Sequence, residues 1–346
     1  MENSNRTQPT DLRWLLALCA AGGTLLLAFV PSDAWQNGAA SPEKQLAAVL
    51  VKQFLTVFLM LIVPALWARL AHRTTPWVLT GLAALAYGCG VLFCGSASDA
   101  LFTVLLIALP GIGLYFLQRY KLSNFRTVLY ESVLILIALF GYACLPDLIR
   151  KGDAYAGAQW VIGLYEKTFT GIGASASDPA VAQLVSAMRE SIGVYKMNAG
   201  AICVPLLLTF AMVCGLSNTL FSHLMNRRGG VALVGLPPFH QWRCERWYVI
   251  LTAGLLIVTL LMRMAGAQNG DALAAVAEPL WRMPCALAGL STVRKLAMLA
   301  RKKWVFWVIV VLMVLLPTMT VLLLTAIGML SSLRKPINVG EDGIRK

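Results

Sequence analysis

Residues 46–68 read LAAVLVKQFLTVFLMLIVPALWA, an apolar run in which Lys52 is the only charged side chain. A hydrocarbon core about 30 Å thick needs roughly 20 helical residues, and this run meets that length. Backbone groups in lipid must be paired within their own segment, so such a run becomes a helix. Comparable runs recur at Trp14–Val30, Trp77–Cys94, Leu101–Leu117, Val128–Leu145, Ala199–Phe221, Trp247–Met262 and Trp304–Leu330. The chain is therefore predicted to be an all-α, polytopic integral membrane helical bundle.

The composition agrees with a protein that lies in a lipid bilayer. Hydrophobic residues make up 58% of the chain, charged residues 13%, and the mean hydropathy is +0.72. A soluble fold would have almost no polar residues with which to cover its core, so a soluble protein is excluded.

The net charge of +13 follows the topology and does not indicate nucleic acid. Basic residues gather in alternate short connections, at Arg69 and Arg73, Arg119 to Arg126, Arg227 to Arg246, and Arg294 to Lys303. The positive-inside rule places these connections and the N-terminus in the cytoplasm, which predicts a multi-pass membrane protein.

The number of spans depends on the segment Asp271–Thr292, which is apolar but contains Glu278, Pro279, Arg282 and Pro284. With it the chain has about nine transmembrane helices and the basic C-terminal tail lies outside. Without it the tail lies inside and the strongest basic connection is exported, so we expect nine. The predicted organisation is a cytoplasmic tail over 1–13, one transmembrane domain over 14–330 and a basic tail over 331–346.

A long insertion, 146–198, separates the fifth and sixth spans on the predicted outer face. Asp178 followed by Pro179 is typical of a helix start, and apolar residues then recur at helical spacing up to Tyr195. A second apolar stripe precedes it between Ala158 and Phe169. We expect two amphipathic interfacial helices, which either anchor on the membrane surface or form a lid over an outward-facing cavity.

Charge inside apolar segments is the usual indication of a functional site in a membrane protein. Glu278 and Arg282 are four residues apart and can pair on one helix face, while Lys52 enters the second span from the same predicted side. The neighbouring prolines predict an unwound stretch, Pro279–Pro284, with both charges facing the interior. The pair is either structural or part of a ligand or ion site, whereas Glu131 is expected at a membrane boundary.

No arrangement of residues indicates an enzyme. The histidines, His72, His223 and His240, have no metal-ligand spacing around them, and no nucleophile or phosphate-loop motif is present. The eight cysteines form no framework and resemble small buried hydrophobic residues. We expect no metal and no cofactor. Gly111-Ile-Gly113 after Pro110 indicates close helix packing or a kink.

The most specific local motif lies on the predicted cytoplasmic side. Two prolines impose an extended backbone, and the aromatic rings and arginine that follow are suited to lipid headgroups. This interfacial elbow consists of Pro237, Pro238, Phe239, Trp242 and Arg243.

From this motif onward the chain resembles the YybS-like bacterial membrane proteins, a family of unknown function, which implies a location in the bacterial cytoplasmic (inner) membrane. The resemblance covers Pro205 to Lys335, including Asn218, His223, Asn226-Arg227-Arg228, the elbow, Ala288-Gly289-Leu290-Ser291 and Ile327-Gly328-Met329. The chain departs from the family pattern at Cys244-Glu245 and Ser331-Ser332. The family is thought to be related to the substrate-binding components of energy-coupling-factor vitamin transporters, which implies a small-molecule-binding bundle.

Two classes of function are consistent with the sequence. The first is a transporter-like component that binds a small-molecule ligand, open to the outer face and covered by the insertion. The second is a non-transporting scaffold or assembly partner for another membrane subunit, using the small residues Ala17 and Ala21 and the elbow as contact surfaces.

Overall fold

The computed structural model describes residues 20, 22–24, 42–94, 97–175, 179–228, 238–267, 270–302 and 304–334. These residues form helices joined by turns, and no strand occurs among them. The chain divides into two compact units, Met1–Val234 and Gly235–Lys346, called here unit 1 and unit 2. The all-α class predicted from the sequence is confirmed.

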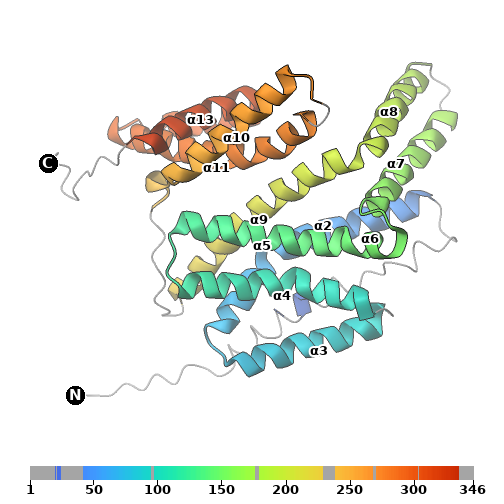
Figure 1. Ribbon diagram of the computed structural model, residues 1–346, viewed down its shortest axis with the longest axis horizontal. Helices are drawn as coiled ribbons and strands as arrows, with labels where there is room; N and C mark the ends of the chain where they lie inside the picture. The colour runs from blue at the N-terminus through green and yellow to red at the C-terminus, as the bar shows by residue number, and fades with distance from the viewer. Residues whose placement is uncertain are drawn as a thin grey trace. The chain divides into compact units, whose positions relative to one another are not determined.

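Unit 1 is a bundle of long apolar helices with a helical insertion (Figure 1). Its helices are α2 (Pro42–Ala71), α3 (Pro76–Cys94), α4 (Ala97–Arg119), α5 (Asn124–Ala143), α6 (Leu145–Lys151), α7 (Ala156–Ser175), α8 (Pro179–Met197) and α9 (Ala199–Arg228). The helices α4 and α9 each pack against both α2 and α5, and α3 packs against α4. The helices α2, α4, α5 and α9 therefore form most of the core of unit 1, and α3 adds Leu79 and Ala86.

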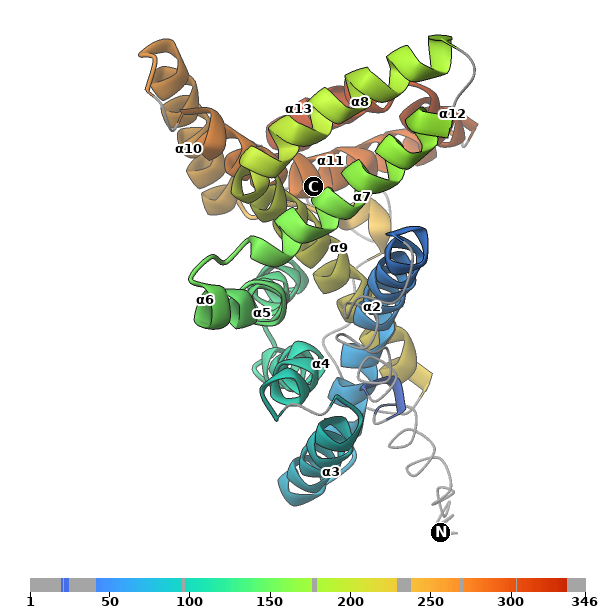
Figure 2. The same ribbon diagram turned by 90° about the vertical axis from the view of Figure 1, so that its right-hand side faces the viewer.

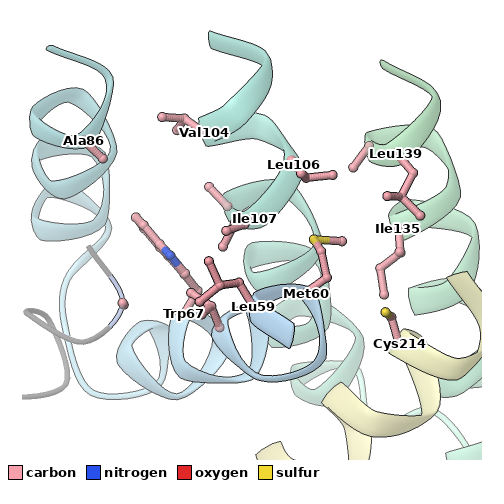
Figure 3. Close-up of a cluster of buried hydrophobic side chains, with 14 of the residues drawn as sticks. Leu59, Met60, Trp67, Ala86, Val104, Leu106, Ile107, Ile135, Leu139 and Cys214 are labelled. Carbon is pink, nitrogen blue, oxygen red and sulfur yellow. The ribbon is translucent and has the colours of Figure 1, made fainter. Parts of the chain in front are cut away.

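The core of unit 1 is filled by aliphatic side chains around one buried tryptophan. Trp67 of α2 is fully buried, and its indole Nε1 donates to Thr24 Oγ1 over 3.3 Å. Between the other helices, Met60 of α2, Ile135 of α5 and Cys214 of α9 belong to the same cluster (Figure 3). Helices α2, α5 and α9 thus contribute to one continuous apolar cluster.

Glycines let α4 approach its two neighbours closely. A Cβ at Gly111 would meet Trp67 Cβ and, at 2.9 Å, Pro64 O of α2, whereas a Cβ at Gly113 would meet the Leu134 side chain of α5. The helix α4 continues through Pro110. The prediction that this Gly-x-Gly segment serves close helix packing is confirmed.

The insertion forms helices, as predicted. After the short α6, the helices α7 and α8 lie side by side as a hairpin (Figure 2), and Lys196 of α8 pairs with Glu166 of α7 at 3.7 Å. Leu164 is buried, but Met188 and Tyr195 of the predicted apolar stripe are exposed. An exposed apolar stripe is what a helix at a membrane surface presents, and that location stays a prediction.

Unit 2 is built on a close helix pair. Its elements are η1 (Phe239–Gln241), α10 (Arg246–Met264), α11 (Gly270–Leu299), α12 (Trp304–Leu315) and α13 (Pro317–Leu333). The pair α11 and α13 makes the most extensive contact. A Cβ at Gly289 would meet the backbone of Leu324, and a Cβ at Gly328 would meet Cys285 O. The Ala-Gly-Leu-Ser and Ile-Gly-Met segments of the resemblance are therefore the two sides of one helix crossing.

Two expectations for unit 2 are wrong in detail. The helix α11 is continuous from Gly270 to Leu299, so the stretch Pro279–Pro284 is not unwound. The run Trp304–Leu330 is not one helix, because it breaks at Leu316, where φ is −130° and ψ is 62°. Pro317 lacks an N–H and restricts the residue before it, which explains the break.

Among the described residues, five helices are long and apolar enough to cross a membrane: Lys44–Ala71, Ala100–Arg119, Asn124–Lys151, Ala199–Met225 and Arg246–Met264. Three shorter apolar helices accompany them, Trp77–Leu92, Trp304–Leu315 and Pro317–Leu333. The multi-pass architecture is confirmed, while the count of nine and the single domain over 14–330 stay predictions. Most of the first run, Trp14–Val30, lies outside the described residues.

Candidate functional site

A proline in α2 opens the helix to a polar partner from α9. Pro64 has no N–H, so the carbonyl of Met60, one turn earlier, loses its helical donor. Asn218 Nδ2 donates to Met60 O over 3.0 Å, and Ser217 Oγ donates to Leu61 O over 3.1 Å. Asn218 is fully buried, and its own Oδ1 accepts no hydrogen bond from the described residues. A strong acceptor thus remains available inside unit 1.

A chain of hydrogen bonds lies where α2, α4 and α9 end. His72 Nε2 lies 3.1 Å from Gln118 Oε1, so this ring nitrogen carries the proton of the bond. Gln118 Nε2 donates to Ser222 Oγ over 2.8 Å, and Ser222 Oγ lies 3.2 Å from Gln118 Oε1. Burial lowers the pKa of His72, and the Gln118 bond opposes that effect. The three C-termini of α2, α4 and α9 therefore meet at one end of unit 1, called here the basic end after Arg73 and Arg119.

Deeper in the same unit, α5 carries a buried carboxyl group. Glu131 of α5 has an exposed fraction of 0%, and neither carboxylate oxygen has a hydrogen-bond partner among the described residues. A buried carboxylate without a donor is costly, and such residues at membrane depth mark binding sites or proton pathways.

The surroundings of Glu131 are formed by residues with small side chains on the two helices that flank α5. Glu131 Oε2 is 4.0 Å from the place that a Cβ would take on Gly113 of α4. From α9, the Cys214 thiol interacts electrostatically with Glu131. A Cβ at Gly215 would meet Ser132 Oγ and, at 2.9 Å, Ser132 N. The carboxylate therefore lies near Gly113 of α4 and Cys214 of α9, the two helices that pack against α5 on either side of it.

One face of α9 connects these groups. Cys214, Asn218 and Ser222 are four residues apart in turn, so they lie on one helix face, and all three are fully buried. At about 1.5 Å of rise per residue the three cover about 12 Å along the axis. The polar core of unit 1, defined as Glu131, Asn218, Ser222, Gln118 and His72, thus extends from the level of Glu131 to the basic end.

The ion pair expected in unit 2 forms. Arg282 Nη1 pairs with Glu278 Oε1, four residues earlier on α11. The Glu278 side chain is 52% exposed and that of Arg282 is 23% exposed, so the expectation of two interior charges is wrong for Glu278. The guanidinium Nε of Arg282 is buried and has no partner among the described residues. Lys52 belongs to unit 1, and a common site with the pair stays a prediction.

The interfacial elbow is held by contacts within unit 2. Pro237 lies outside the described residues, and Pro238 is extended with φ −56° and ψ 146°. The rings of Phe239 and Trp242 have centroids 5.5 Å apart. The guanidinium of Arg294 lies 5.8 Å from the centroid of Phe239 and 5.4 Å from that of Phe306. Phe239 therefore takes part in a cation–π contact between η1 and α11. The lipid contact predicted for Arg243 stays a prediction.

The six cysteines that the structure describes are free. Cys244, at a position where the chain departs from the family pattern, is buried. Its thiol hydrogen-bonds to Cys285, and this bond together with burial raises its pKa. Cys244 is accordingly a weak nucleophile at neutral pH and serves as a packing residue.

Within the described part of the chain, no group of three or more histidine, cysteine or acidic side chains could hold a metal ion. Several membrane-crossing helices, together with a buried polar core inside one of the units, define a polytopic α-helical membrane protein. The chain matches the family model described as "Predicted membrane protein (DUF2232)" over residues 46–330. It therefore belongs to that family, and the resemblance to a membrane family of unknown function is confirmed. Comparisons with curated proteins and with solved structures give no match.

Proposed function

We propose that the protein is a transporter-like membrane component that binds a small molecule in unit 1. The observation that carries the proposal is Glu131, which is fully buried in a membrane-crossing helix and has no hydrogen-bond donor among the described residues. A structural residue at this place would be apolar or paired, because an unpaired buried polar group destabilises the fold. A ligand or ion that pairs with the carboxylate accounts for it.

The surroundings of Glu131 support a small ligand. Asn218 Oδ1 offers a second unpaired acceptor on the helix that flanks Glu131. Two acceptors without donors favour a ligand that carries N–H, O–H or positive charge. Small-molecule binding is also what the resemblance drawn from the sequence implies, through the similarity it suggests to energy-coupling-factor components. The proposal assigns no chemical step to the chain.

The proposal is tested by identifying the small molecule that the full chain retains through purification in mild detergent. Mass spectrometry after denaturation should find one compound at a fixed ratio to the wild-type protein, and Glu131→Gln should lose it while staying folded. Adding the identified compound back should raise the thermal unfolding midpoint of the wild type and not that of Glu131→Gln.

The matched control is Glu278→Gln, the same change in the ion pair of unit 2, which should retain the compound. If Glu278→Gln loses it and Glu131→Gln keeps it, the ligand site lies at the Glu278–Arg282 pair. If neither protein carries a compound and no compound of a metabolite library raises the unfolding midpoint, the transporter-like proposal is wrong. The scaffold would then be the better hypothesis, with co-purification of a membrane partner as its test.

A further inference from the structure

We infer that Glu131 is a proton-binding site that exchanges with the solution at the basic end of unit 1. This inference deepens the proposed function, since the proton would be the ion coupled to ligand binding. The unpaired carboxyl of Glu131 needs a partner, and a proton is the simplest one. No ligand is needed to examine it, because the proton itself serves as the probe.

The groups around Glu131 leave its charge uncompensated. Helices α4, α6 and α9 pack against α5. The described titratable and charged side chains of these helices are Tyr115, Arg119, Asp147, Arg150, Lys151, Cys203, Cys214 and His223, and α5 itself adds Arg126, Tyr130 and Tyr142. None of them forms a hydrogen bond with the carboxylate, and the neutral thiol of the neighbouring Cys214 supplies no positive charge. Without a cationic partner, a carboxyl in this setting holds a proton.

A proton is favoured over a metal ion by the same surroundings. Sodium and other hard cations need several oxygen ligands arranged around them. Around Glu131 the structure places Gly113 and the Cys214 thiol, and the unpaired Asn218 Oδ1 lies one helical turn beyond Cys214 on α9. One such oxygen does not make the shell of ligands that a hard cation needs. A proton needs only the carboxylate itself.

The route to solution follows the polar face of α9. From Glu131 the next buried polar side chain on this face is Asn218, followed one turn later by Ser222, which is bonded to Gln118. His72 bonds to the same amide and is partly exposed. In uptake, a hydronium ion at the basic end gives one proton to the Ser222 hydroxyl, which passes its own proton on toward Glu131. The hydronium ion becomes water, the Ser222 O–H bond is restored and the Glu131 carboxylate gains one O–H bond. Release is the reverse step.

The experiment is infrared spectroscopy of the full chain in detergent. A protonated carboxyl gives a C=O band that the carboxylate lacks, and the difference between wild type and Glu131→Gln assigns it to Glu131. We expect this band at neutral pH, with reversible loss on alkalinisation. Because Glu131→Gln could misfold, Glu131→Asp serves as a second variant and should shift the band. Absence of the band from folded wild type, or its loss on adding sodium at constant pH, overturns the inference.

The route is tested by the rate at which the band shifts after transfer to D₂O. Ser222→Ala should slow the exchange by at least about tenfold, as expected when a proton-transferring group is removed. The matched control is Thr103→Val, a buried polar side chain near the other end of α4, which should leave the rate unchanged. Equal rates in wild type and Ser222→Ala, or equal slowing in both variants, refute exchange through the basic end.

The two proposals fail separately. If the wild-type C=O band titrates but no compound is retained, the proton-site inference holds and the ligand proposal is wrong. If a compound is retained in a Glu131-dependent way but no band is seen at neutral pH, the ligand proposal holds and the proton-site inference is wrong.

Discussion

His72 is the residue through which pH should act on the end of unit 1. Its ring bonds to Gln118, and burial holds its pKa below the ordinary value of 6.5. Acidification therefore protonates the unfolded chain before the folded one, and the free energy of unfolding should fall as the pH drops from about that ordinary value through the lower folded-state pKa. Above that range both states carry a neutral ring, and this contribution does not change.

We expect His72→Gln to reduce this acid sensitivity while keeping a group that can bond to Gln118. The measurement is the thermal unfolding midpoint of both proteins in detergent between pH 8 and pH 5, roughly the range over which histidine titrates. At the highest pH the histidine is neutral in both the folded and the unfolded state, so a difference between the two unfolding midpoints there reports packing alone. A midpoint that falls equally in both proteins on acidification would show that His72 does not carry the effect.

The burial of Glu131 differs from what its place in the sequence suggests. Glu131 follows a basic connection closely, so the sequence suggests a residue at the membrane boundary. In the structure α5 begins well before it, because the side chain of Ser123 caps the helix by accepting a hydrogen bond from Arg126 N at 3.3 Å. The helix therefore starts early, and Glu131 lies almost two turns inside it. In the sequence, Ser123 could have indicated this early helix start. The full burial of Glu131 also depends on Gly113 and Cys214, which are distant in the sequence, and local sequence patterns do not predict such contacts.

At the scale of elements, prolines change a helix only as far as its neighbours allow. Two prolines in α11 predict an unwound stretch from the sequence, but the helix is continuous. Pro284 removes the donor for Leu280 O, and Tyr248 OH of α10 supplies one over 2.5 Å. Asn218 does the same for Met60 O opposite Pro64. The donor comes from another helix in both units, so the α11 sequence alone could not predict this outcome.

This arrangement can be measured with a double-mutant cycle in unit 2. Tyr248→Phe leaves Leu280 O unpaired and should lower the free energy of unfolding by about 1–3 kcal/mol. In a Pro284→Ala background the helix N–H returns, and the cost of Tyr248→Phe should fall below about 1 kcal/mol. The measurement is unfolding by SDS titration in mixed micelles. Equal costs in both backgrounds would show that the hydroxyl does not replace the missing N–H.

The crossing of α11 and α13 is the second feature at this scale. A Cβ at Gly328 would meet Cys285 O and, at 2.7 Å, Gly289 N, and backbone atoms cannot move aside as a side chain can. Gly328→Ala should therefore destabilise the protein by about 1–3 kcal/mol, or more if the helices separate. Gly254 of α10 has nothing within 4 Å of its added Cβ. The control Gly254→Ala should be neutral or raise stability by about 0.5–1 kcal/mol.

The thermal unfolding midpoint should fall in Gly328→Ala and should stay the same or rise in Gly254→Ala. Equal and small effects would mean that the crossing tolerates a wider separation than the structure has. A loss of stability in Gly328→Ala would give a physical reason for the glycine in the Ile327-Gly328-Met329 segment: only a residue without a Cβ fits at this helix crossing.

At the scale of the whole molecule, the sequence predicts orientation from charge, and unit 1 adds a constraint that charge does not contain. The contacts His72–Gln118 and Gln118–Ser222 place the C-terminal ends of α2, α4 and α9 together. Since α4 has the length to cross the membrane, its start near Ala97 lies at the opposite end from the end of α9. The connection before α4 and the connection after α9 must therefore lie on opposite sides of the membrane, whichever side is the cytoplasm.

We expect the connection after α9 to be cytoplasmic and the start of α4 to be external, with the N-terminus inside. In a background without the eight native cysteines, Ala97→Cys should react in intact cells with a membrane-impermeant thiol reagent. Gly230→Cys should react only after the cells are opened. The reverse pattern would invert the orientation and leave the bundle intact. Labelling of both positions from outside would contradict the packing of α2, α4 and α9 itself, because their shared end cannot lie on the same side as the start of α4.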